Sequence, residues 1–335
     1  MKDQNQENQK PKWQKYVLNP HVLLLVLGIC ILVYILIRLN HWGVKIDKDY
    51  IDEHGIYTDG KDTYDVIYPL TAEDGSFLAN KSPHTILFFG NSILAEDRNS
   101  ENGIVNMIAK QANATVYNAS VADSLLAAQS DSLKHTESGL DVYNFYWLCV
   151  YLTMRGQTDY FDWLEEQQGA NILPETKELR TLLETIDMDT VDTIAIMYDA
   201  NDYLNGSFMQ NPDDETDITS FTGNLKAGLA LLRTTYPNIR IIVLSPTYAF
   251  GIDDNGNYIS SDQKIYEGGA TLSSYVMSEC TAVVSEYVSF IDNIYGTFNE
   301  DEAPECLKDN IHLNQKGREL VVKRFISALT QFDEK

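Results

Sequence analysis

The sequence predicts an α/β protein in which a parallel sheet of about five strands is covered by helices on both faces and is preceded by one transmembrane helix. Two observations predict the sheet: short apolar runs alternate with helical patterns, and the runs are apolar at consecutive positions. Parallel neighbours need crossover connections, and strands buried on both faces lack polar alternation. The expected strands are residues 85–89, 115–118, 193–198, 239–244 and 288–292.

The 335-residue chain is strongly acidic, with a formal net charge of -24. Six basic and two acidic residues in positions 1–45 give that segment a charge of +4, which leaves -28 for the rest of the chain. Such a surface repels phosphate backbones, so nucleic acid is excluded as a partner. With 44% hydrophobic residues, the chain has enough apolar material for a folded core.

The transmembrane helix is predicted from a long uncharged stretch near the amino terminus. No formally charged side chain occurs from position 17 to position 37. A helix of that length, at about 1.5 Å per residue, measures roughly 31 Å and matches a hydrocarbon core of about 30 Å. Lys15 and Arg38 bracket the stretch, and no small-residue cleavage site follows it. We therefore expect an uncleaved signal anchor over residues 17–38 rather than a signal peptide or a buried core helix.

The anchor separates two parts of the chain. A long carboxyl-terminal domain that follows a single apolar segment is usually translocated. Residues 1–16 are therefore expected to be a cytoplasmic tail, and the body is expected outside the cell on a single-pass membrane protein. Residues 39–83 are polar and rich in turn-forming residues, and we interpret them as a connector.

Residues 84–335 are predicted to form one domain. Two of its helices carry apolar residues at helical spacing. These residues are Phe221, Leu225, Leu229 and Leu232 in one helix and Val321, Val322, Phe325 and Leu329 in the last one. Residues 141–186 have a helical pattern that exceeds a minimal βα unit, and we interpret them as an insertion. It is either a packing layer beside the sheet or a lid or partner surface.

A serine follows the first expected strand. The chain runs from Phe89 directly into Gly90, Asn91 and Ser92, which places the serine at the first turn beyond the strand. In open α/β sheets, sites form at the carboxyl ends of strands. Ser92 is therefore a candidate nucleophile, and the alternative is a serine that only caps a helix.

A histidine and an aspartate that could activate a serine lie near the carboxyl terminus. Asp309 precedes His312 by three residues, so one turn can present both side chains. A carboxylate held to one imidazole nitrogen fixes the tautomer and leaves the other nitrogen free to accept the serine proton. We interpret His312 as the candidate general base and Asp309 as the residue that orients it.

A polar cluster follows the third expected strand, where Asp199, Asn201 and Asp202 occur within four residues. The amide of Asn201 could donate a hydrogen bond to an oxyanion. The alternative is that Asn201 only forms a turn at the strand end.

Four segments resemble, in order, the sequence blocks of the SGNH (GDSL-type) serine hydrolases. They are Phe-Phe-Gly-Asn-Ser-Ile-Leu, Tyr-Asn-Ala-Ser, Asp-Ala-Asn-Asp-Tyr and Asp-Asn-Ile-His-Leu-Asn. The resemblance covers about residues 85–330 and implies a flavodoxin-like three-layer αβα sandwich. It also implies Ser92 as nucleophile and oxyanion-hole residue, His312 as base, Asp309 as its orienter and Asn201 as an oxyanion donor.

Three positions depart from the family pattern. Asn91 replaces the aspartate of the first block, and Asp199 stands at a glycine position of the third. The second-block glycine, whose N–H joins the oxyanion hole, has no clear equivalent, and Ala122 is the nearest candidate. The Asp199 carboxylate could face the site and oppose an oxyanion, or point into its own loop and accept backbone hydrogen bonds.

Neither a metal nor a cofactor is expected, because the sequence contains no metal-ligand spacing and no cofactor motif. Cysteines are too sparse for a disulfide framework. Among those outside the anchor, a bridge between Cys280 and Cys306 is left open.

These observations predict a membrane-anchored, extracellular serine esterase that acts on acyl esters, with O-acetylated cell-envelope carbohydrate as the expected substrate. Three alternatives remain. The same chemistry could pass the acyl group to a sugar hydroxyl within an envelope acyltransferase system, or the substrate could be a lysophospholipid or a thioester. The chain could also be a degenerate, non-catalytic binding protein, for which Asp199 is the main support.

Overall fold

The computed structural model describes residues 28–29, 31–32, 63–71, 77–78, 82–132, 139–155, 160–168 and 174–333. The chain divides into two units, residues 1–50 and 51–335, and the fold below is that of the second. The predicted tail lies outside the described residues, as do most of the predicted anchor and connector. Within the described ranges, no helix has both the length and the apolar character needed to cross a bilayer.

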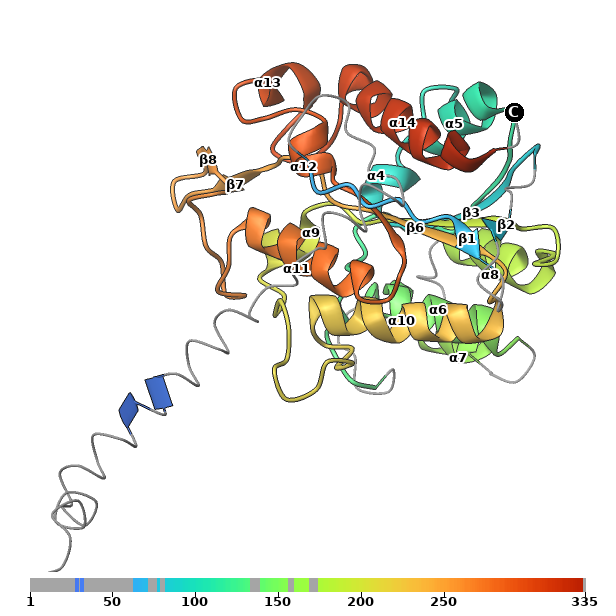
Figure 1. The fold of residues 1–335 in the computed structure, drawn as a ribbon, viewed down its shortest axis with the longest axis horizontal. Coiled ribbons are helices and arrows are strands. Elements are labelled where there is room, and N and C mark those ends of the chain that lie inside the picture. Colours follow the sequence, from blue (N-terminus) through green and yellow to red (C-terminus); the bar gives the residue numbers. More distant parts are fainter. Residues whose placement is uncertain are drawn as a thin grey trace, which may run out of the picture. The chain divides into compact units, whose positions relative to one another are not determined.

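A five-stranded parallel sheet forms the centre of the domain (Figure 1). Its strands follow the order β4, β3, β5, β6 and β9. All four strand pairs are parallel. The strands are β3 (Thr85–Gly90), β4 (Thr115–Asn118), β5 (Thr193–Met197), β6 (Arg240–Leu244) and β9 (Ser289–Ile291). Every residue of β5, β6 and β9 is buried, which explains their continuous apolar runs. The predicted parallel sheet is confirmed.

Helices cover both faces of this sheet, so the domain has three layers (Figure 1). One face carries α5 (Ile104–Ala112) and α14 (Gln315–Leu329). The other carries α6 (Phe145–Thr153), α10 (Phe221–Thr235) and α11 (Leu272–Val284). Shorter helices are α4 (Ser92–Ala95), α9 (Asn201–Asn205), α12 (Asn293–Gly296) and α13 (Ala303–Cys306).

The predicted insertion contributes to the packing against the sheet. It contains a 3₁₀ turn (Asp141–Tyr143), α6, α7 (Tyr160–Gln168) and α8 (Pro174–Thr185). The Phe145 ring is fully buried and meets the Phe89 ring edge-on, with the centroids 5.8 Å apart. A Cβ on Gly228 of α10 would lie 2.4 Å from the same ring. For α6, the packing-layer alternative therefore holds.

Two features differ from what the sequence suggested. A hairpin of β7 (Phe250–Ile252) and β8 (Tyr258–Ser260) was not expected, although Gly256 at its tip has the positive φ that such turns require. Cys280 and Cys306 are both buried and free, so they do not form the bridge that was left open.

A buried ion pair joins the segment before the sheet to the last helix. Arg324 of α14 approaches both carboxylate oxygens of Asp65 at 2.6 Å, and the backbone N–H of Asp292 donates to Asp65 at 2.7 Å. Burial raises the pKa of Asp65 although Arg324 opposes the shift. Beyond this pair, Val66 bridges Phe290 of β9, and β1 (Leu70–Thr71) pairs with β2 (Phe77–Leu78).

Replacing Arg324 with leucine should lower the free energy of unfolding by about 3–5 kcal/mol, because it leaves the buried Asp65 carboxylate without its cation. Urea denaturation measures this change. Lys110→Ala is the control, since its ion pair with Glu101 is exposed and should contribute little. An Arg324→Leu protein as stable as wild type would contradict the prediction.

Candidate active site

Ser92 lies at the carboxyl end of β3, as the first residue of the short helix α4. Its side chain is only 2% exposed. The glycine two residues earlier is needed for close packing: a Cβ on Gly90 would lie 2.1 Å from the carbonyl oxygen of Met197 on β5. The tight junction of β3 and β5 therefore fixes where Ser92 emerges from the sheet.

The hydroxyl of Ser92 contacts Asp123, a residue that sequence reasoning missed. The Asp123 backbone N–H donates to Ser92 Oγ at 2.9 Å, and Ser92 Oγ donates to Asp123 Oδ1 at 3.3 Å. Asp123 has a φ of 60°, the left-handed conformation that favours glycine. The structure thus places this N–H one residue beyond Ala122, which is exposed. The sequence offered no signal for Asp123, because only the structure shows that this aspartate has the backbone conformation favoured by glycine.

His312 and Asp309 lie in the loop before α14. His312 Nδ1 donates to Asp309 Oδ2 at 2.8 Å, while Asp309 Oδ1 accepts the backbone N–H groups of Ile311 and His312 at 2.9 and 2.8 Å. Partial burial would raise the pKa of Asp309, but these hydrogen bonds outweigh it and lower the pKa. Asp309 therefore stays ionised and holds the imidazole with Nε2 free of the pair.

Glu96 faces the other nitrogen of this imidazole. Its Oε1 lies 3.8 Å from His312 Nε2, while its Oε2 accepts hydrogen bonds from Lys308 and the buried Arg318, both at 2.8 Å. Glu96 follows Ser92 by one helical turn, and its backbone N–H donates to the Ser92 carbonyl. No hydrogen bond joins Ser92 to His312 in the described residues. The Ser92 hydroxyl donates to Asp123, and the His312 imidazole donates to Asp309.

The pKa of His312 reflects this acidic environment. Burial alone would lower it. The hydrogen bond and the charge of Asp309, together with the charges of Glu96 and Asp199, outweigh burial, so the pKa of His312 is raised above its usual value. The imidazole is therefore protonated to a higher pH than a free histidine would be.

Asn91 and Asp199 form a reciprocal pair beside Ser92. Asn91 Nδ2 donates to Asp199 Oδ1 at 2.7 Å, and the Asp199 backbone N–H donates to Asn91 Oδ1 at 3.0 Å. Asp199 Oδ1 also accepts the Asn201 N–H at 3.0 Å. Burial raises the pKa of Asp199 to about 7 despite these bonds and the charge of His312. Oδ1 thus accepts hydrogen bonds from its surroundings, as expected if the carboxylate points into its own loop. Oδ2, in contrast, is buried without a partner in the described residues.

Asn201 and Asp202 begin the short helix α9. The side-chain amide of Asn201 makes no hydrogen bond within the described part of the chain and remains available to a ligand. The buried carboxylate of Asp202 accepts the backbone N–H groups of Leu126 and Ala127 at 2.7 and 3.0 Å. Asp202 therefore fixes the loop that carries Asp123. Among the described residues, no group of three or more potential ligands is placed to hold a metal ion.

Comparison with known proteins identifies the family of the chain. The profile of the GDSL-like lipase/acylhydrolase family matches residues 86–325. The chain belongs to this family. The resemblance inferred from four short segments is therefore confirmed, and so is the prediction of an ester-hydrolysing enzyme at the level of the family. No match was found among curated proteins.

Several solved structures are similar to the chain at low sequence identity. A protein from Lactobacillus plantarum is 17% identical with a TM-score of 0.50, covering 76% of this chain and 98% of its own. A carbohydrate acetylesterase family member from Sinorhizobium meliloti is 12% identical with a TM-score of 0.43, covering 74% and 98%. A family two carbohydrate esterase from Clostridium thermocellum is 14% identical with a TM-score of 0.43, covering 77% and 67%. At these identities the first similarity supports the fold alone.

Replacing Glu96 with glutamine should lower the pKa of His312, because it removes a negative charge that favours the imidazolium and keeps the side chain's size. The pH titration of the His312 Cε1–H NMR signal measures this directly. Glu101→Gln removes an equal charge from an exposed position paired with Lys110 and should leave the titration unchanged. Coincident titrations of wild type and Glu96→Gln would show that Glu96 does not act on the imidazole.

Proposed function

We propose that the chain is a membrane-anchored, extracytoplasmic serine esterase that hydrolyses acyl esters, above all O-acetyl esters, of cell-envelope carbohydrate. The observation that carries the catalytic part is the placement of Ser92 against a backbone N–H donor, with the Asp309–His312 pair on a neighbouring loop. The anchor and compartment are supported by the uncharged stretch at positions 17–37. Membership of the acylhydrolase family supports ester hydrolysis.

The proposed reaction begins when His312 Nε2 accepts the proton of Ser92 Oγ, after the hydroxyl has turned from Asp123 Oδ1 towards the imidazole. Oγ attacks the ester carbonyl carbon, and the carbonyl oxygen becomes an oxyanion. Three donors are available to it: the backbone N–H groups of Ser92 and Asp123 and the amide of Asn201. His312 then gives the proton to the leaving sugar oxygen, and an acyl-serine remains.

Water completes the cycle by the same route. His312 removes a proton from water as the oxygen attacks the acyl carbon, and then returns that proton to Ser92 Oγ. The products are the free sugar hydroxyl and the carboxylic acid. Asp309 supports both steps because its hydrogen bond keeps the proton on Nδ1 and stabilises the imidazolium.

Asp199 is compatible with this mechanism. Its pKa of about 7 means that near neutral pH the carboxylate is charged in only part of the molecules. In its neutral form it does not oppose an oxyanion, and its Oδ1 still accepts the hydrogen bonds that hold Asn91 and Asn201. The departure at Asp199 is therefore weak support for a non-catalytic protein.

Ser92→Ala and His312→Ala should each abolish hydrolysis of an aryl acetate, and the double variant should lose no more, because nucleophile and base act as a unit. Asp309→Ala should retain more activity. A fluorophosphonate probe should label wild type and Ser285→Ala, the control serine, but not Ser92→Ala. Labelling or turnover at the wild-type rate in Ser92→Ala would place the nucleophile elsewhere.

Asn201→Ala should reduce kcat for the same ester about 10²-fold or more if the amide stabilises the oxyanion. Because the amide acts on the transition state, KM should change little. Asn257→Ala is the control, since its exposed side chain donates to Asp253 in the turn of the β7–β8 hairpin. A kcat near the wild-type value in Asn201→Ala would remove this residue from the oxyanion hole.

A further inference from the structure

A groove of about 760 Å³ is lined by chain segments that follow two segments of the candidate active site. Its lining comes from three segments, residues 125–131, 205–208 and 217–219, and we call it the Phe208 groove. The first segment continues the loop that carries Asp123, and the second follows α9, which begins at Asn201. The groove therefore lies along the chain segments that follow Asp123 and Asn201, and its volume is typical of a ligand site.

Phe208 is the largest apolar side chain of this groove, and it is 70% exposed. Its backbone is fixed: the Phe208 carbonyl accepts the N–H of Phe221 at 2.8 Å, and the residue forms a β-bridge with Ser220. An aromatic ring that is exposed to solvent on a rigid backbone offers a flat apolar face at small entropic cost.

Apart from Phe208, Leu125, Ala128 and Gly206, the described residues of the lining are polar, and none of them is basic. Hydroxyl, amide and carboxylate groups come from Gln129, Ser130, Asp131, Asn205, Ser207, Asp217 and Thr219. Partial burial would raise the pKa of Asp217, but hydrogen bonds from Asn211 and Thr219 outweigh it and lower the pKa, so Asp217 stays ionised. Among the described lining residues, two are carboxylates and none is lysine, arginine or histidine, so this lining repels anionic ligands.

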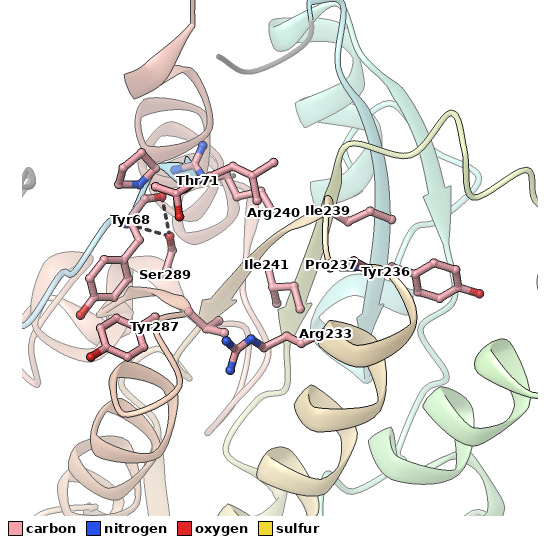
Figure 2. A pocket seen from close by; sticks show the side chains of 13 residues that line it. Tyr68, Thr71, Arg233, Tyr236, Pro237, Ile239, Arg240, Ile241, Tyr287 and Ser289 are labelled. Atoms are coloured by element: carbon pink, nitrogen blue, oxygen red, sulfur yellow. Dashed lines mark hydrogen bonds between the residues drawn. The ribbon is translucent and has the colours of Figure 1, made fainter. Parts of the chain in front are cut away.

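Another cavity, drawn in Figure 2, has the opposite character. It measures about 220 Å³ and lies at the amino ends of β6 and β9, where Arg233, Arg240 and Tyr287 contribute to its lining. The carboxyl ends of the same strands point towards Ser92, so this cavity is at the far edge of the sheet. Both arginines are already engaged, Arg233 with Glu286 and Arg240 with the carbonyls of Ala328 and Leu329.

We propose that the Phe208 groove binds the sugar chain of an uncharged acylated polysaccharide and presents its ester to Ser92. A sugar ring stacks its C–H face on Phe208, and its hydroxyl groups pair with the amides and carboxylates of the lining. Polymers that carry phosphate or uronate groups are disfavoured because Asp131 and Asp217 repel them. This substrate class rests on the proposed esterase function, whose chemistry does not itself require the groove.

The experiment compares three acetyl esters hydrolysed by the full-length protein: an aryl acetate, an acetylated neutral xylo-oligosaccharide and an acetylated oligogalacturonide. Wild type should prefer the neutral oligosaccharide to the anionic one. Phe208→Ala should lower kcat/KM for the neutral oligosaccharide about tenfold more than for the aryl acetate, through KM rather than kcat. Tyr287→Ala is the matched control, because Tyr287 is 69% exposed but lies at the opposite edge of the sheet.

A charge variant tests the second part of the proposal. Asp131→Asn should raise kcat/KM for the oligogalacturonide severalfold relative to the xylo-oligosaccharide, and high salt should remove this gain. Equal use of the two oligosaccharides by wild type, with no gain in Asp131→Asn, would overturn the assignment to uncharged polymers.

The outcomes distinguish a failure of the groove assignment from a failure of the proposed esterase function. If wild type hydrolyses the aryl acetate but Phe208→Ala and Tyr287→Ala lose oligosaccharide activity equally, the groove assignment is wrong and the esterase stands. If wild type hydrolyses none of the esters and Ser92 is not labelled, the esterase fails. In that event, calorimetric titration with the deacetylated xylo-oligosaccharide still decides the groove: binding that Phe208→Ala weakens supports it, and absent or unaltered binding overturns it.

Discussion

The buried amide of Asn91 holds together the three loops from which the site is built. Its Nδ2 donates to the carbonyl of Ser124 and to Asp199 Oδ1, and its Oδ1 accepts the Asp199 N–H. Because Ser92 follows directly, the position of the nucleophile depends on this one side chain. The departures from the family pattern at Asn91 and Asp199 thus form one interaction, in which the Asp199 carboxylate accepts a hydrogen bond from the Asn91 amide.

Carboxylates dominate the electrostatics of the site. Glu96 and Asp309 face the two nitrogens of His312. Asp123 contacts Ser92, and Asp199 accepts a hydrogen bond from the adjacent Asn91. Burial raises the pKa of Asp199 to about 7, and the surrounding carboxylates raise the pKa of His312 above its usual value. The charge of His312 lowers the pKa of Asp199, and the charge of Asp199 raises the pKa of His312, so a change at either residue should alter the pKa of the other.

Hydrogen bonds and ion pairs from the surrounding residues hold the loops that carry these carboxylates in place. Asp202 binds the loop that carries Asp123, and Arg318 together with Lys308 holds one oxygen of Glu96. The close approach of Gly90 to β5 sets the exit of the chain towards Ser92. The site is thus positioned by backbone donors and by the partly exposed ion pairs of Glu96, whereas the Phe208 groove is lined by residues that follow Asp123 and Asn201 in the chain.

The sequence by itself determined the parallel sheet, the family and the residues Ser92, Asn201, Asp309 and His312 as candidates, because apolar runs and short local motifs encode them. Only the tertiary structure decided the rest. Asp123 rather than Ala122 offers its N–H to Ser92, since a left-handed backbone cannot be read from an aspartate. Glu96 and the pairing of Asn91 with Asp199 come from side chains that meet across different loops, and such contacts leave no periodicity or spacing in the chain.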